Sequence, residues 1–73
     1  MKRTVNLNVL DQWISTHRPN GMFRLGERSG VSAWTIAKVK SGYVPKKTIT
    51  RKLLSDAIGV HEEVLFPLLE TAS

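Results

Sequence analysis

The residues between positions 38 and 52 have the composition of a segment that binds a polyanion. This segment holds six basic residues and no acidic one. Five basic and two acidic residues precede it (+3), and four acidic and no basic residues follow it (−4), so the whole chain carries +5. A cationic block beside an acidic end favours one surface that meets a polyanion and another that stays away from it. A solvated lysine-rich surface without a partner is the alternative that the charge leaves open.

The sequence lacks the residue patterns that usually support catalysis or bind a metal. The chain has no cysteine, and its two histidines, His17 and His61, do not have the spacing of a metal-binding motif. It also lacks a glycine-rich loop of the kind that cradles phosphates. We therefore expect no enzyme, no metal, no cofactor and no small-molecule ligand. His17 is predicted to be partly buried with its hydrogen bonds satisfied, and His61 to be a helix cap.

The size and composition predict one small globular domain that spans residues 1–73. Hydrophobic residues make up 41% of the chain, which is enough for a core and too much for a disordered basic tail. The longest uninterrupted apolar run is Val64 to Phe66, far short of the roughly 20 residues that cross a bilayer. The absence of cysteine fits a reducing compartment. We therefore expect a cytoplasmic protein that does not span a membrane.

Every clear hydrophobic period in the chain is helical. The first helix is predicted from Asn8 to a stop before Arg18-Pro19, because a residue that precedes proline avoids the helical region. Its apolar stripe consists of Val9, Leu10, Trp13, Ile14 and His17. Asn20-Gly21 supplies a turn and a cap, and Met22 to Ser29 makes a brief second helix before Gly30.

Three more short helices are predicted downstream. Ser32 is a good N-cap for a third helix from Ala33 to Lys40. Thr48 is expected to cap a fourth helix that Gly59 ends. The apolar positions of this fourth helix are Ile49, Leu53, Leu54, Ala57 and Ile58. Glu62 to Phe66 forms a last short turn that Pro67 ends. The sequence therefore predicts the all-α class, with four to five short helices.

The second and third helices form a unit between about residues 22 and 41. They are joined by a tight turn of glycine and valine, which is typical of a helix-turn-helix. Leu25 and Ile36 are expected to pack against each other, and Gly26 to let the two helix axes approach closely. Gly30 can adopt the left-handed conformation that the turn requires, and Val31 is expected to fill the space beneath it. The Ser32 cap would leave the amino end of the third helix pointing outward at an anion.

An ordered series of residues runs through this unit and beyond it. It comprises Leu25-Gly26-Glu27-Arg28-Ser29-Gly30-Val31-Ser32, Thr35-Ile36, Gly42, Pro45, Ala57-Ile58-Gly59-Val60 and Leu65-Phe66. In this series the chain resembles the Cro and phage-repressor type of helix-turn-helix proteins, the lambda-repressor-like family, over roughly residues 7 to 66. The resemblance implies a domain whose third helix lies in the major groove of DNA.

The chain also departs from the pattern of that family. Met22 stands where a glutamine often opens the second helix, and Gly26 stands where alanine is common. Lys40 replaces an acidic residue near the end of the third helix, which adds positive charge on or near the expected DNA side. The segment between Pro45 and Gly59 is one residue longer than usual.

The resemblance implies a role for individual residues. The base-reading candidates on the third helix are Ala33, Trp34, Ala37 and Lys38. Lys38 is the best candidate for a guanine contact, because lysine can donate to guanine O6 and N7. Trp34 would either press on a thymine methyl or a sugar, or fold over the second helix. The phosphate-contact candidates are Ser32, Thr35, Ser41, Tyr43, Lys46, Lys47, Arg51 and Lys52.

We therefore expect a sequence-specific transcriptional regulator, a Cro-like repressor of phage or prophage type in a bacterial cytoplasm. It would act by occupying operator DNA, with its concentration as its main input. Binding as a homodimer is expected through part of an apolar carboxy-terminal patch, unless that patch completes the monomer core. The patch consists of Val64, Leu65, Phe66, Leu68 and Leu69.

Two alternatives remain open at the level of the sequence. The first is an antitoxin or anti-regulator, a protein-interaction module whose acidic and apolar end, Glu62 to Glu70, grips a protein partner. The second is an architectural protein that binds DNA without sequence preference.

Overall fold

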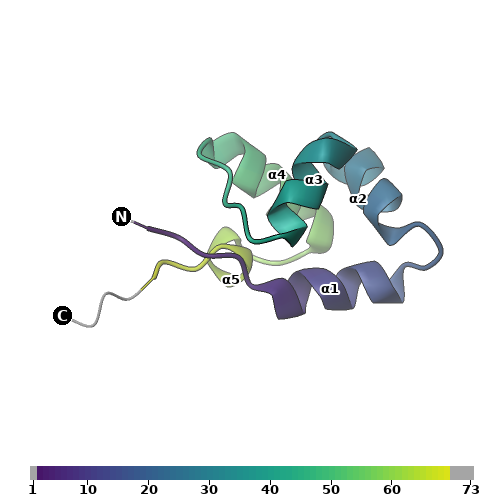
Figure 1. Ribbon diagram of the computed structural model, residues 1–73, viewed down its shortest axis with the longest axis horizontal. Coiled ribbons are helices and arrows are strands. Elements are labelled where there is room, and N and C mark those ends of the chain that lie inside the picture. Colours follow the sequence, from purple (N-terminus) through teal and green to yellow (C-terminus); the bar gives the residue numbers. More distant parts are fainter. Residues whose placement is uncertain (1, 70–73) are drawn as a thin grey trace.

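A computed structural model describes residues 2–69, and in them the chain is all-α with five short helices (Figure 1). In chain order the helices are α1 (Leu7–Thr16), α2 (Gly21–Ser29), α3 (Ala33–Lys40), α4 (Thr48–Ile58) and α5 (Glu62–Leu65). Helix α1 lies along one side of the molecule, while α3 and the start of α4 lie on the other side (Figure 1). This arrangement confirms the predicted fold class. Within residues 2–69, no helix has the length and apolar character that a membrane crossing needs.

Helix α1 has Asn6 as its N-cap residue and His17 as its C-cap residue. The Asn6 side chain accepts a hydrogen bond from the Val9 N–H, which satisfies one of the free donors of the first turn. At the other end, the His17 ring stacks on Trp13 with 3.8 Å between ring centroids, and His17 Nδ1 lies 2.8 Å from the Trp13 carbonyl oxygen. The half-buried imidazole therefore has a partner, as the sequence predicted for this residue.

The close approach of α1 and α2 depends on Gly21. A Cβ at this position would run into the backbone of Ile14, including its carbonyl oxygen. Asn20, just before it, adopts a left-handed conformation (φ 63°) that reverses the chain. The sequence suggested Gly21 only as a turn residue, whereas its lack of a side chain is what lets the two helices touch.

The turn between α2 and α3 has the geometry that the helix-turn-helix prediction requires. Gly30 has a φ of 76°, and a Cβ on Gly26 would lie 3.2 Å from the Val31 carbonyl oxygen. The buried Ser29 hydroxyl donates to the Leu25 carbonyl and accepts the Val31 N–H, so it closes the turn with two hydrogen bonds. Helices α2 and α3 are thus held in one fixed relative orientation.

The core lies between the helices and is made of nine buried apolar residues. They are Val5, Leu10, Trp13, Leu25, Ile36, Val39, Leu54, Leu65 and Phe66. Leu25 and Ile36 are both fully buried in it, as the sequence predicted, and Val31 packs against it. Removing a side chain of this kind costs about 2–5 kcal/mol, so the core fixes where α3 sits.

Helix α4 differs from the prediction in two respects. Its N-cap residue is Lys47, and Thr48 is the first residue of the helix instead of its cap. Ile49 and Leu53, which the helical period assigned to the apolar face, are 66% and 41% exposed. Leu54 and Ser55 are the residues of this helix that are buried. The prediction was wrong because an apolar residue can follow the helical period without having a neighbour to bury it.

The two ends of the described chain lie side by side. Arg3 and Leu68 form an antiparallel bridge, and Thr4 and Asn6 donate backbone hydrogen bonds to the carbonyls of Pro67 and Leu65. This pairing buries Val5, which no sequence pattern had assigned to the core. Leu68 and Leu69 therefore pair with the amino-terminal residues, since the Leu69 N–H also donates to the Lys2 carbonyl.

Candidate nucleic-acid interface

Helix α3 has an inner and an outer side. Ile36 and Val39 point into the core, and Ala33, Trp34 and Ala37 lie on the exposed side. Trp34 is 71% exposed, so it does not fold over α2, and this alternative reading of the residue was wrong. The outer side thus carries the base-reading candidates that the resemblance implied, at the spacing of i and i+4 that places residues on one helix face.

A cleft of about 330 Å³ lies between α3, the loop of residues 41–47 and the start of α4. Its lining brings six of the predicted DNA-contacting residues together and adds Pro45 and Thr50. The predicted six are Trp34, Thr35, Lys38, Tyr43, Lys46 and Lys47. Thr50 was missed because a single threonine in the first turn of a helix has no distinguishing signal in the sequence. We call this cleft, with Ala33 and Ala37 beside it, the basic face.

Lys38 occupies a central position on the basic face. Its Nζ lies over the Trp34 ring and over the Tyr43 ring, at 4.4 Å from each ring centroid. The Tyr43 N–H donates to the Lys38 carbonyl at 3.0 Å, which fixes the aromatic residue next to the lysine. These contacts explain why Lys38 is half-buried on an otherwise exposed helix side.

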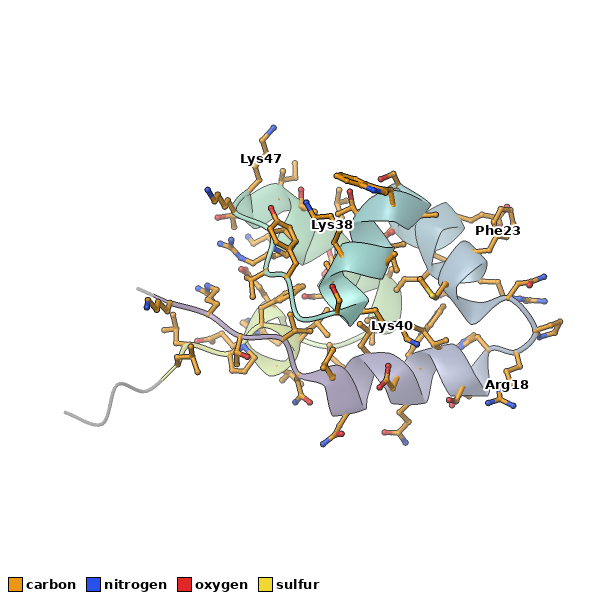
Figure 2. The ribbon with its side chains drawn as sticks, in the orientation of Figure 1. Arg18, Phe23, Lys38, Lys40 and Lys47 are labelled. Carbon is orange, nitrogen blue, oxygen red and sulfur yellow. The ribbon has the colours of Figure 1, made fainter. Side chains whose placement is uncertain are left out.

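Lys38 and Lys47 extend on the same side of the molecule, opposite α1 (Figure 2). Lys46 and Lys47 are both exposed, on the loop that leads into α4. No lysine among residues 2–69 forms a salt bridge with another residue of this range. The cations of the basic face are therefore free to interact with an external anion.

Arg51 does not belong to the basic face, which corrects its prediction as a phosphate contact. Its guanidinium group forms hydrogen bonds within the protein, and its side chain is only 11% exposed. It donates to the Glu62 carboxylate at 2.8 Å and to the carbonyls of Pro45 and Lys46 at 2.7 and 3.0 Å. A further hydrogen bond joins it to the Thr48 hydroxyl at 2.9 Å. Arg51 thus ties α4 and α5 to the loop that carries the exposed lysines.

The contact with Arg51 changes the pKa of Glu62. The hydrogen bond from Arg51 lowers the pKa of Glu62, partly opposed by desolvation and aided by the charges of Arg51, Arg3 and Lys52. Lys52, another phosphate candidate, is exposed on α4 but does not line the cleft. The structure therefore separates it from the basic face.

The small hydroxyl residues at the two ends of α3 already have protein partners. Ser32 accepts the Thr35 N–H as the N-cap, and its hydroxyl lies 3.0 Å from that of Thr35. The Ser41 hydroxyl donates to the Lys38 carbonyl at 2.7 Å. Ser32 and Ser41 are exposed, so their remaining lone pairs and the N–H groups of the first turn still face solvent.

Lys40 lies apart from the basic face, in contrast to what its position near the end of α3 suggested. It points toward α1 and lines a different cavity of about 610 Å³, together with Asp11 and Arg18 (Figure 2). This cavity carries both signs of charge, whereas the cleft of the basic face is lined by lysines and no acidic residue.

The apolar carboxy-terminal patch divides into buried and exposed residues. Leu65 and Phe66 are completely buried in the monomer core, which corrects their prediction as dimer contacts. Val64, Leu68 and Leu69 are 44%, 40% and 48% exposed. The acidic residue Glu70, the last one in the predicted protein-binding segment, lies outside the described residues.

The described residues thus hold one exposed surface that combines two aromatic rings, three lysines and the outer side of a helix. Comparisons of the chain with models of protein families, with curated proteins and with solved structures found no match.

Proposed function

We propose that this protein is a sequence-specific DNA-binding regulator of transcription, of the Cro and phage-repressor type, which acts in the cytoplasm. In this proposal α3 enters the major groove and its outer residues Ala33, Trp34, Ala37 and Lys38 meet the base edges. The observation that carries the proposal is the basic face, where an exposed helix side and three lysines without acidic partners share one surface.

The size of α3 fits this role. A helix with its side chains is about 10–12 Å across, and the major groove of B-DNA is about 12 Å wide. Because Ala33 and Ala37 are small and exposed, they let the helix approach the bases closely. Lys38 would donate to guanine, for which a good contact is worth about 1–3 kcal/mol of discrimination.

The residues around α3 supply the backbone contacts. Lys46 and Lys47 extend from the loop before α4, where they would meet phosphate oxygens beside the groove. Contacts of this kind set the register of the protein on the duplex and make its affinity depend on salt. Arg51 supports them indirectly, because it holds the carbonyls of Pro45 and Lys46 in place.

Random-site selection on duplex DNA, followed by sequencing, tests the proposal. We expect an enriched motif, and an affinity for that duplex that exceeds the affinity for a scrambled duplex of the same length by about 10³-fold or more at one fixed salt concentration. Equal affinities for both duplexes would contradict the proposal and favour an architectural binder. No binding to any duplex would favour the protein-partner alternative.

The exposed residues Val64, Leu68 and Leu69 support a dimer on DNA, in which the same patch of two subunits meets. A dimer predicts two half-sites about 10–10.5 base pairs apart, centre to centre. Footprinting checks this spacing, and sedimentation of the complex counts the subunits. A single half-site bound by a monomer would assign the patch to another partner, as in an antitoxin or anti-regulator.

A further inference from the structure

We infer that Trp34 and Tyr43 determine specificity through Lys38, by holding its ammonium group between their rings before DNA arrives. This inference rests on the proposed function and deepens it, because it assigns to Tyr43 a positioning role where the sequence suggested a phosphate contact. The site it concerns is the cleft of about 330 Å³ on the basic face.

We call Trp34, Tyr43 and Lys38 the clamp, and in it the ammonium group lies at the same distance from both rings. Lys38 Nζ is 4.4 Å from the centroid of each ring, well within the distance of about 6 Å at which a ring face attracts a cation. Trp34 stands one helical turn before Lys38, and the backbone hydrogen bond from Tyr43 to the Lys38 carbonyl places the second ring. Two separate elements, α3 and the loop after it, thus converge on one ammonium group.

The clamp matters because lysine is otherwise a flexible side chain. A free lysine must lose much of its rotamer freedom when it forms a directed hydrogen bond, and this loss weakens the contact. A lysine that is already confined loses less, so its contact gains affinity from preorganisation. Lys46 and Lys47 have no such aromatic partners among residues 2–69. This contrast fits an assignment of Lys38 to a base edge and of the other two to phosphates.

The experiment compares Tyr43→Leu, which removes the ring, with Tyr43→Phe, which removes only the hydroxyl group. Both variants are made in the wild-type chain and in a Lys38→Met background. Two quantities are measured: the ratio of affinities for the selected and scrambled duplexes, and the NMR shift of the Lys38 ε-methylene protons in the free protein. Ring currents from two aromatic faces should move these protons upfield.

We expect an upfield shift in the wild type that Tyr43→Phe keeps and Tyr43→Leu reduces. The affinity ratio should fall about twofold to fivefold in Tyr43→Leu, stay near the wild-type value in Tyr43→Phe, and not fall further in the Lys38→Met background. The salt dependence of the affinity should not change with Tyr43→Leu, because no cation is removed. A ring that only supports the fold would lower the thermal stability and would act equally in both backgrounds.

Three results would overturn the inference. Lys38 ε-methylene protons at the shift of an ordinary exposed lysine would show that the clamp does not form. An equal loss of affinity for both duplexes in Tyr43→Phe and Tyr43→Leu, with the affinity ratio unchanged, would assign Tyr43 to a phosphate through its hydroxyl group. An equal loss with and without Lys38 would show that the ring acts on its own. Failure of the proposed function is distinguishable, since the wild type itself would then show no sequence preference while the NMR shift still reports on the clamp.

Discussion

Three lysines and one arginine between positions 38 and 51 of this chain are used in opposite ways. On the basic face, Lys38, Lys46 and Lys47 have no acidic partner among residues 2–69. At the junction of α4 and α5, Arg51 is 11% exposed and makes four hydrogen bonds to the protein. Sequence reasoning had placed all four residues on one DNA-binding surface.

The difference follows from the chemistry of the two side chains. The planar guanidinium of arginine can serve several acceptors at once, which suits a junction where a carboxylate and two carbonyls converge. Three other arginines also contact the protein: Arg3 donates to the Phe66 carbonyl, Arg24 donates to the Pro19 carbonyl, and Arg28 lies over the Trp13 ring. Arg51 and Arg3 thus connect separate parts of the fold, and the lysines of the basic face remain available to a partner.

Reversing the charge of the basic face should have the largest effect. The double variant Lys38→Glu and Lys47→Glu should lose at least about 100-fold in affinity for the selected duplex, because it removes one base contact and one phosphate contact and adds repulsion. Both residues lie outside the core, but Lys38 loses its contacts with the Trp34 and Tyr43 rings, so the free energy of unfolding should fall by about 1–2 kcal/mol. Fluorescence anisotropy and urea unfolding measure the two quantities.

The matched control is the double variant Arg18→Glu and Lys40→Glu. It makes the same change in net charge, on residues that line the mixed cavity away from the basic face. We expect a loss of less than about tenfold, from the long-range field alone. Equal losses in the two variants would mean that total charge, and not the basic face, governs binding.

Breaking the Arg51 junction should act on stability. Arg51→Ala leaves the Glu62 carboxylate and two carbonyls without their donor, which should cost about 2 kcal/mol of unfolding free energy. Lys52→Ala, next to it on the exposed side of α4, should cost less than about 0.5 kcal/mol. Chemical denaturation followed by circular dichroism measures both. Similar losses in the two variants would contradict the division of labour between lysines and arginines.

The same junction predicts a dependence of stability on pH. Because the pKa of Glu62 is lowered in the folded state, its carboxylate stabilises the protein above its unfolded-state pKa. That contribution should be lost as the pH falls through the folded-state pKa. Glu62→Gln should therefore flatten the acid side of a plot of unfolding free energy against pH. Glu63→Gln is the control, since Glu63 is exposed, and an equal flattening by this variant would count against the junction.

The smallest effect should come from a single phosphate contact. Lys47→Gln should weaken binding to the selected and scrambled duplexes by the same factor, of about two to five, and reduce the salt slope by about one. Lys38→Gln should instead lower the ratio between the two affinities. Salt titrations of both variants on both duplexes separate the two roles. A lowered ratio in Lys47→Gln would mean that this lysine reads bases.

The parts of the fold that sequence predicted correctly are those that depend on neighbours in the chain. The Ser32 cap, the bounds of α3 and the left-handed Gly30 all follow from local backbone rules, and each agrees with the structure. The outer side of α3 could also be predicted from the sequence, because Ile36 and Val39 fix its inner side and the other positions follow from the helical period.

The parts that escaped prediction depend on contacts distant in the chain. Arg51 and Glu62 are eleven residues apart, and no local pattern indicates that one neutralises the other. Val5 is buried only because the amino-terminal segment pairs with residues 65–68. In the same way, the resemblance alone did not show that Tyr43 would lie over the ammonium of Lys38 instead of turning its hydroxyl to a phosphate.

The central claim is that DNA binds on the basic face, and mapping amide chemical shifts during titration with the selected duplex tests it most directly. We predict the largest shifts at residues 33–38 and 43–50, smaller shifts at Val64, Leu68 and Leu69 where two subunits meet on DNA, and α1 nearly unchanged. The largest shifts at residues 11–18 or 64–69, with the basic face unaffected, would contradict the account.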